Sequence, residues 1–363
     1  RIVGYYDPTV NMPGVDLTQL VNGITYPNST YLGNAFAPED QYTLDTDLQD
    51  QPFAPTEVNT TSVLWDGTEY FAVANTPTYS DIINSADGVT WTLAKLSNEP
   101  LALTDIVYSG NAYVITSQNN ATPILVSEDG ITWATTGTVA GTVSINSTSL
   151  NSVAYLNGVF VAVGDNIVTS SDGYTWTETL ASLSTSELTN TFIGVSGINI
   201  TNFDGFIAVG AGQQVISGST TNINLLFLSS NGTTWTQVTP AITSQSLNAV
   251  TSGNDLIMLV GNNGAKFTST NGSNWIDVSS GTNELNDVVY VDSLSLFVAV
   301  GDNGVIETSC DDGATWVTET SCTTENLNGI IWNSDNSEFV VTGDNNIILM
   351  STDGTTWTST TVF

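Results

Sequence analysis

The sequence contains no histidine and only three basic residues, Arg1, Lys95 and Lys266, beside 36 acidic residues. The formal net charge is −33, yet charged residues make up only 11% of the chain, against about 25% in an average protein. Lysine and arginine are therefore missing, rather than acid being in excess. Without basic side chains to neutralise phosphates, we expect neither nucleic-acid binding nor attraction to an anionic membrane surface.

The same absences exclude several kinds of active site. A Ser-His-Asp triad needs histidine, and zinc sites built on histidine or clustered cysteine are likewise excluded. No run of about 18 apolar residues is present, so we expect no membrane insertion. The two cysteines, Cys310 and Cys322, are expected to lie too far apart for a disulfide and to be buried or partly buried thiols.

Serine, threonine and asparagine stand where charges are usually found. We interpret this composition as a protease-resistant surface that is exposed outside a cell or on a virus particle. The sequence begins at Arg1, without a start methionine or a signal-peptide pattern, so we expect a processed chain or a piece of a longer one.

One short motif occurs seven times along the chain. "SSDGYTWT" at residues 170–177 and "STDGTTWT" at residues 351–358 are two of the copies. The seven motif tryptophans are separated by 40 to 43 residues, except for one gap of 59 residues between Trp176 and Trp235. A steady period of this length is typical of repeat architectures.

Each period predicts four short antiparallel strands. In the third period, Asn-Gly and Asp-Gly turns separate alternating apolar runs, which is a strong hairpin signal. The strands expected there are Ser152–Tyr155, Val159–Val163, Ile167–Ser170 and a fourth from Thr175. Seven such units predict an all-β fold, a seven-bladed β-propeller of four-stranded antiparallel blades with a short irregular N-terminal extension. The last strand completes the seventh blade, so we expect no strand exchange at closure.

The repeated motif resembles the Asp box of sialidase-type (BNR) repeats. The sixth copy, Ser309-x-Asp311-x-Gly313-x-Thr315-Trp316, matches that box residue for residue, and the other copies match a form that is one residue shorter. The resemblance covers about residues 60–363 and implies a propeller; sialidases, some endoglucanases, sorting receptors and photosystem-assembly factors share it. The box positions are Asp87, Trp91, Asp129, Trp133, Asp172, Trp176, Asn231, Trp235, Asn271, Trp275, Asp311, Gly313, Trp316, Asp353 and Trp357.

We interpret the boxes as structural turns. Glycine supplies the positive φ, the preceding Asp or Asn folds its side chain onto turn N–H groups, and tryptophan packs between blades. Asn231 and Asn271 replace aspartate in two copies, which an Asx turn tolerates and a catalytic carboxylate would not. The seven tryptophans are therefore not interpreted as a ligand cage.

A second set of turns faces the other way and is the candidate ligand face. These Gly-Asp-Asn turns join the second and third strands, on the side where ligands usually dock in propellers of the family that the motif resembles. A ring of their carboxylates would suit Ca²⁺, although plain turn chemistry explains the same residues. The candidates are Asp165, Asn166, Asn262, Asn263, Asp302, Asn303, Asp344 and Asn345.

The function we expect is non-enzymatic. Sialidases of the family hold their substrate with three arginines, which this chain cannot supply, and photosystem-assembly propellers carry arginines that are absent here. We predict a structural or recognition propeller on a capsid, tail, fibre or surface layer, with no cofactor. The alternatives are a glycosidase that uses two carboxylates and a soluble glycan-binding module.

Two segments depart from the repeat. Residues 1–57 have no Asp box and are predicted to be a docking arm, or the end of a preceding domain, that contacts protein partners in a larger assembly; residues 58–363 form the propeller. In the long fourth period, Gly197–Asp204 and Ala211–Asn224 are expected to be surface loops.

Overall fold

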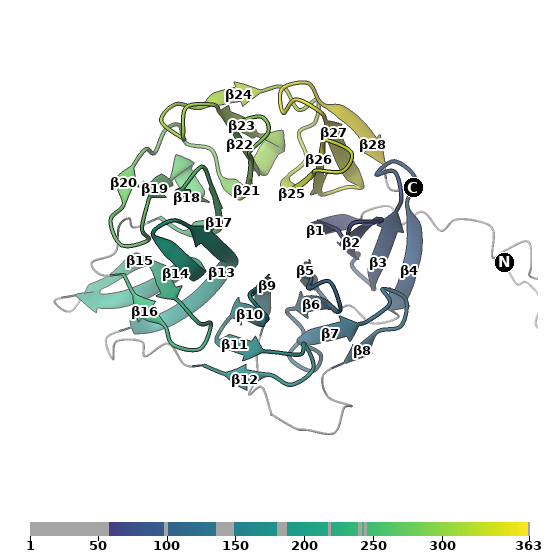
Figure 1. The fold of residues 1–363 in the computed structure, drawn as a ribbon, viewed down its shortest axis with the longest axis horizontal. Helices are drawn as coiled ribbons and strands as arrows, with labels where there is room; N and C mark the ends of the chain where they lie inside the picture. Colours follow the sequence, from purple (N-terminus) through teal and green to yellow (C-terminus); the bar gives the residue numbers. More distant parts are fainter. Residues whose placement is uncertain are drawn as a thin grey trace, which may run out of the picture. The chain divides into compact units, whose positions relative to one another are not determined.

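The computed structural model describes residues 58–361, except residues 98–100, 136–148, 180–186, 217–218, 239–241 and 243–244. The described residues contain seven four-stranded antiparallel sheets, arranged as blades around a central axis (Figure 1). The predicted seven-bladed propeller is therefore confirmed. Residues 1–57 lie outside the described residues, so the proposed docking arm and its boundary remain predictions.

The first four blades are each built from four consecutive strands. Blade 1 consists of β1 (Asn59–Trp65), β2 (Tyr70–Asn75), β3 (Ser80–Ser85) and β4 (Thr92–Ser97). Blade 2 consists of β5 (Leu103–Tyr108), β6 (Tyr113–Ser117), β7 (Ile124–Ser127) and β8 (Ala134–Thr135). Blade 3 consists of β9 (Leu150–Leu156), β10 (Val159–Gly164), β11 (Ile167–Ser170) and β12 (Thr177–Glu178). Blade 4 consists of β13 (Glu187–Ile200), β14 (Phe203–Ile216), β15 (Ser219–Ser229) and β16 (Thr236–Gln237).

The last three blades follow the same plan. Blade 5 consists of β17 (Leu247–Gly253), β18 (Leu256–Gly261), β19 (Lys266–Ser269) and β20 (Ile276–Asp277), with the 3-10 turn η3 (Asn262–Gly264) between β18 and β19. Blade 6 consists of β21 (Leu285–Val291), β22 (Leu296–Gly301), β23 (Ile306–Ser309) and β24 (Val317–Glu319), with η4 (Asp302–Gly304) between β22 and β23. Blade 7 consists of β25 (Leu327–Asn333), β26 (Glu338–Gly343), β27 (Ile347–Ser351) and β28 (Thr358–Thr361).

The hydrophobic core lies between neighbouring blades. Seven clusters of buried side chains each draw on two adjacent blades and on one Asp-box tryptophan. The second strands lie in the middle of this packing, and runs such as Phe160–Val163 are buried on both faces. This explains why the second strands are nearly continuous apolar runs, as expected for strands covered on both sides.

The ring closes between blades 7 and 1 without strand exchange, as predicted. Thr60 Oγ1 donates a hydrogen bond to the carbonyl of Gly343 (2.8 Å) and accepts one from the Gly343 N–H (3.1 Å). The N–H of Asn346 also donates to the carbonyl of Val58 (2.8 Å). Side-chain and backbone hydrogen bonds therefore join the two ends of the propeller.

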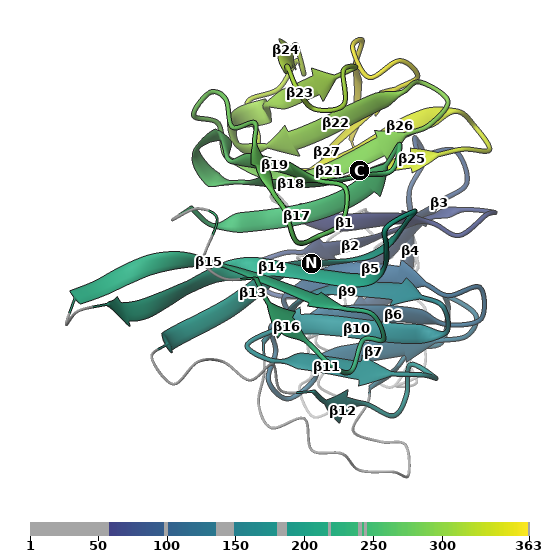
Figure 2. The ribbon, with the colours of Figure 1, turned by 60° about the vertical axis from the view of Figure 1, so that its left-hand side comes forward.

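Blade 4 differs from the prediction. The two expected surface loops are largely strand instead, because β13, β14 and β15 are long: residues 197–200 and 203–204 pair on either side of a two-residue turn, and residues 211–216 pair with 219–224. Figure 2 shows the three strands reaching beyond the neighbouring blades. Residues 211–216 pair with residues 219–224, so their backbone groups are satisfied by a ladder. Their glycine-, threonine- and asparagine-rich composition concealed this.

The two cysteines are free, so the predicted absence of a disulfide is confirmed. Both are exposed, however, and the expectation that they would be buried or partly buried is wrong. Cys310 lies in the Asp-box turn of blade 6, and Cys322 lies in the link between β24 and β25. These are surface positions in this fold, because turns and links run outside the packed strands.

Candidate functional site

The two sets of turns lie at opposite ends of the strands. In an antiparallel blade, the turn after the first strand and the turn after the third strand share one end. We name this end the Asp-box face; it carries the seven Asp-box turns and the first hairpin turns. The other end, named the Gly-Asp-Asn face, carries η3, η4 and the turns at Asp165–Asn166 and Asp344–Asn346.

Each Asp-box turn is held by its Asp or Asn side chain. In blade 3, Asp172 Oδ1 accepts hydrogen bonds from the N–H groups of Tyr174 (2.8 Å) and Thr175 (2.7 Å). In blade 4, Asn231 Oδ1 accepts from Thr233 (3.0 Å) and Thr234 (2.9 Å) in the same way. The asparagine copies thus reproduce the bonds of the aspartate copies, with Oδ1 of each side chain engaged in the turn.

The glycine and tryptophan of each box tie the turn to the core. All seven tryptophans donate their indole N–H to the carbonyl of the box glycine, at 2.7–3.0 Å. All seven glycines have a positive φ. They also face the preceding blade: a Cβ on Gly354 would lie 2.7 Å from Leu296 Cδ2, and one on Gly313 would lie 2.2 Å from Met258 Cε. The box is therefore both a turn and an interblade contact.

The candidates on the Gly-Asp-Asn face are bonded largely to neighbouring residues. Asp302 Oδ1 accepts from Asn286 Nδ2 (2.9 Å), Asn262 Oδ1 accepts from Asn248 Nδ2 (2.7 Å), and Asp344 Oδ1 accepts from Asn328 Nδ2 (2.9 Å). Asn263 and Asn303 adopt a positive φ, as turn residues do. Asp165 and Asn166 form the turn between β10 and β11, where the Asp165 N–H donates to the carbonyl of Ser149 (3.1 Å).

These candidates are not brought together as a cation site in the described part of the chain. No group of three or more Asp, Glu or Cys side chains is placed to hold a metal ion among the residues that the structure describes. Asn345 instead faces its neighbours, with its N–H donating to Asn59 Oδ1 (3.2 Å) across the closure between blades 7 and 1.

A set of asparagines that the sequence analysis did not single out links the blades. Asn248, Asn286 and Asn328 each follow a leucine at the start of a first strand, and each also donates to a backbone carbonyl of the next blade. Asn286 Nδ2, for example, donates to the carbonyl of Leu327 (3.0 Å). The recurring Leu-Asn pair in the sequence could have indicated that these asparagines share a role. The sequence does not reveal which carbonyl each amide reaches.

A bulge in each first strand creates a second repeated position. The register of the first and second strands shifts by one residue in every blade, which leaves an N–H group outside the ladder. We name the residues that follow these bulges the inner ring, taking in β13 the second of its two shifts, between Phe192 and Gly194; the first strands lie closest to the axis (Figure 1). The inner ring consists of Ser62, Asp105, Ser152, Gly194, Ala249, Asp287 and Gly329.

The two aspartates of the inner ring connect adjacent blades. Asp105 accepts from Ser62 Oγ (2.7 Å) on blade 1 and from Ser152 Oγ (2.8 Å) on blade 3. Asp287 Oδ2 accepts from the N–H of Ile330 on blade 7 (2.9 Å). Burial raises the pKa of both carboxyl groups, that of Asp287 to about 7, and the negative charge of Asp105 contributes to the rise at Asp287.

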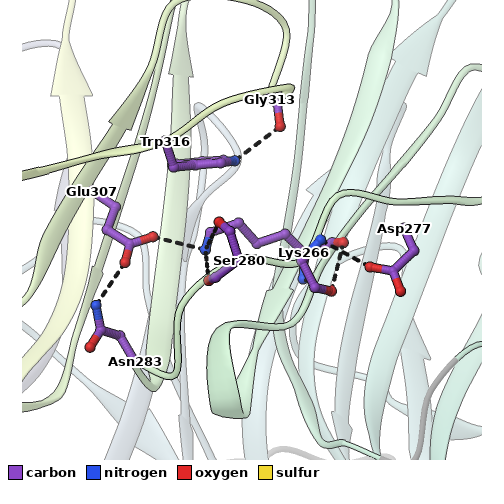
Figure 3. Close-up of polar contacts among 8 residues, drawn as sticks. Lys266, Asp277, Ser280, Asn283, Glu307, Gly313 and Trp316 are labelled. Atoms are coloured by element: carbon purple, nitrogen blue, oxygen red, sulfur yellow. Dashed lines mark hydrogen bonds and ion pairs between the residues drawn. The ribbon is translucent and has the colours of Figure 1, made fainter.

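The lysine of blade 5 is buried in an interblade ion pair (Figure 3). Lys266 Nζ lies 2.8 Å from Glu307 Oε2 and donates to the carbonyl of Ser280 (3.0 Å). Glu307 Oε1 accepts from Asn283 Nδ2 (2.7 Å), and the ammonium lies 5.3 Å from the centre of the Trp316 ring. Such a pair must be well bonded, because an isolated buried charge is very costly.

No protein-family model matches the chain, and no curated protein matches it in sequence. Among solved structures, the chain is similar to YCF48 from Cyanidioschyzon merolae, with a TM-score of 0.57 and 18% identity over 82% of this chain and 95% of that one. A structure of YCF48 bound to a D1 peptide matches with a TM-score of 0.51 and 13% identity, over 71% of this chain and 82% of that one.

Two bacterial proteins are also similar in fold. Virginiamycin B lyase from Staphylococcus aureus, in a catalytically inactive form with quinupristin, matches with a TM-score of 0.61 and 11% identity over 85% of this chain and 97% of that one. PorZ, a surface component of the type-IX secretion system of Porphyromonas gingivalis, matches with a TM-score of 0.54 and 13% identity over 84% of this chain and 38% of that one. At these identities the likeness shows the propeller fold alone. Among the described residues, no helix is long and apolar enough to cross a membrane.

Proposed function

We propose that the chain is a non-enzymatic structural or recognition propeller of the Asp-box type, displayed outside a cell or on a virion. The observation that carries this proposal is that the acidic and basic side chains that could take part in catalysis are bonded to other parts of the protein. Asp105, Asp287, Lys266 and Glu307 each bond across a blade boundary, and the Asp-box carboxylates hold turns. Groups that an enzyme would direct at a substrate are here directed at the protein itself.

Two similar structures are compatible with this role. PorZ is a bacterial surface component, and YCF48 has a structure bound to a peptide, so proteins with this fold can stand at a surface and can bind a peptide. The scarcity of Lys and Arg supports an exposed location, because few sites remain for proteases that cleave after basic residues. We therefore infer that the partners are proteins of a larger assembly, contacted in part through residues 1–57.

The size of the native particle tests this proposal. Unfractionated source material would be examined by sedimentation and electron microscopy, with the chain located by a specific antibody. We expect the chain in a large ordered assembly. A free monomer, with no loss of mass from any larger particle when the chain is removed, would contradict the structural role.

A two-carboxylate glycosidase is the second candidate, and one observation favours it. Burial raises the pKa of Asp287 to about 7, as in a general acid, and the inner ring also holds a second carboxyl group, that of Asp105. A panel of neutral and acidic polysaccharides would be incubated with the wild type, with Asp287→Asn and with the Asp-box variant Asp353→Asn. Turnover that is lost only in Asp287→Asn would establish the hydrolase and overturn the non-enzymatic proposal.

A further inference from the structure

One position near the Asp-box face carries aromatic side chains in five blades. It is the residue of each first strand that pairs with the large apolar residue near the start of the second strand. Around the ring these residues are Trp65, Tyr108, Tyr155, Gly197, Ser252, Tyr290 and Trp332. The aromatic members belong to blades 6, 7, 1, 2 and 3, which are consecutive around the axis (Figure 1). We name these five residues the aromatic arc.

The arc is partly open to solvent although its rings are held firmly. All five side chains are half-buried. Each ring packs on the aromatic residue with which it pairs, with centroids 4.3–4.6 Å apart. Tyr290 also lies against the backbone of blade 5, since a Cβ on Gly253 would come within 1.7 Å of its ring. Rings fixed in this way can contact a partner at little cost in conformational entropy.

Trp65 of the arc, and the two tyrosines on which Trp65 and Tyr108 pack, donate hydrogen bonds to carboxylates. Trp65 Nε1 donates to Asp335 Oδ2 (2.9 Å), and Tyr70, which packs on Trp65, donates its hydroxyl to Glu338 Oε1 (2.6 Å). Tyr113, which packs on Tyr108, donates its hydroxyl to Asp66. Lys266 is fully buried, so it offers this face no exposed positive charge. Electron-rich rings beside carboxylates attract ammonium and guanidinium groups.

Exposed apolar side chains on the same face favour a protein partner over a sugar. Val89, Ile131 and Leu294 are 51%, 72% and 40% exposed, and they lie in the Asp-box-face turns of blades 1, 2 and 6. These are three of the blades that carry the arc. Apolar groups surrounded by polar ones mark surfaces at which proteins associate.

We propose that the aromatic arc binds a protein segment that carries lysine or arginine side chains. The cationic groups lie over the rings of the arc and beside Asp66, Asp335 and Glu338, while apolar side chains of the partner cover Val89 and Ile131. The site ends at blades 4 and 5, where Gly197 and Ser252 replace the rings. This inference rests on the proposed recognition function and names the chemistry of its partner.

The test uses the full 363-residue chain and two labelled probes. One is a peptide of four Arg-Gly repeats, and the other is a peptide of four Ser-Gly repeats; a neutral cello-oligosaccharide serves as a third ligand. We expect the Arg-Gly peptide alone to bind, and its affinity to fall at least tenfold between 50 and 300 mM salt, roughly as expected for screening of several charge contacts.

Variants distinguish binding of the Arg-Gly peptide by the arc from binding caused by the general negative charge of the chain. Trp332→Ala and Tyr108→Ala are expected to weaken binding of the Arg-Gly peptide at least fivefold, whereas Trp332→Phe keeps a ring and weakens it less than threefold. Asp277→Asn, on the outer strand of blade 5, is the matched charge control and is expected to change affinity less than twofold. Equal losses in Asp277→Asn and Trp332→Ala would overturn the proposal, as would arc-dependent binding of the cello-oligosaccharide.

A measurement on the wild type covers the case in which a variant fails to fold. Indole N–H resonances would be followed by NMR during titration with the Arg-Gly peptide. We expect the Trp65 and Trp332 signals to shift, and those of the buried Trp91, Trp176 and Trp357 to stay in place. Equal shifts of all indole signals, or no shifts, would contradict the proposal that the aromatic arc binds the peptide. Arc variants that still assemble into native particles would contradict the arc proposal. They would leave the proposed structural function in place.

Discussion

Lys266 Nζ of blade 5 lies 2.8 Å from Glu307 Oε2 of blade 6, and both side chains are buried. The same two positions are apolar in other blades. The register places Ile124, Ile167, Ile306 and Ile348 at the position of Lys266, and Leu125, Val168, Phe267 and Leu349 at the position of Glu307. The ion pair thus occupies a place where the fold elsewhere uses simple packing.

Breaking this pair is expected to be far more damaging than replacing it. Lys266→Met leaves the Glu307 carboxylate buried without its partner, which should lower the free energy of unfolding by about 3–5 kcal/mol. The double variant Lys266→Ile/Glu307→Leu copies the other blades and should lie within about 1–2 kcal/mol of the wild type. Urea denaturation measures both. A double variant as unstable as the single one would mean that the pair contributes net stability.

The Asp-box carboxylate is expected to act only as a hydrogen-bond acceptor. Asp353 Oδ1 accepts from the N–H groups of Thr355 (2.8 Å) and Thr356 (2.7 Å), as Asn231 does in its own turn. Asp353→Asn keeps an acceptor and loses only the charge, so it should cost clearly less stability than Asp353→Ala, which should cost about 1–2 kcal/mol. Thermal melts of the two variants decide this, and similar melting temperatures would show that the bonds matter little.

The Asp-box glycine is expected to be needed for space as well as for its backbone angle. Gly354 and Gly110 both have a positive φ, but only Gly354 has neighbours where a Cβ would stand. Ala at either position should lower the free energy of unfolding by about 1–2 kcal/mol, because its Cβ disfavours the left-handed backbone. Gly354→Ala should lose about 1–3 kcal/mol more, because Leu296 must move. Equal losses in denaturant unfolding would assign the whole effect to φ.

Stability is expected to rise as the pH falls from 8 to about 5. The pKa of Asp81 is raised by burial to about 6 and that of Asp287 to about 7, so the folded state binds protons that the unfolded state has released. Below about pH 4 the trend reverses, because hydrogen bonds lower the pKa of Asp129 to about 2 and that of Asp353 also lies below its usual value. Melting temperatures measured from pH 8 to below pH 4 would show both the rise (the upper limb of the profile) and the fall (the acid limb).

The matched control for the upper limb is Asp287→Asn. This variant removes the group that titrates near pH 7, so its gain in stability between pH 8 and 6 should be smaller than that of the wild type. Asp353→Asn should leave that gain unchanged and affect only the acid limb. A wild-type profile that is flat between pH 8 and 5 would contradict the assignment of a raised pKa to Asp287.

Local patterns in the sequence determined the number of blades, most strand positions and the Asp-box turns. Strands that were expected at Val159–Val163 and Ile167–Ser170 occur as β10 and β11, β10 being one residue longer. This succeeded because hairpin turns and alternating apolar residues act over fewer than ten residues, and the repeat restates them seven times. The box hydrogen bonds likewise lie within a few residues of Asp172 and its equivalents.

Only the tertiary structure decided which residues meet across the blades. Asp105 and Ser152 are 47 residues apart, and Trp65 and Asp335 are 270 residues apart, so no local pattern connects them. The curvature of the ring brings them together, and it also aligns Trp332, Trp65 and Tyr108 into one arc. Blade 4 shows the same limit, because residues 211–216 and 219–224 became strands only through a pairing ladder that their composition does not reveal. Turn chemistry is local, whereas sites are built by packing.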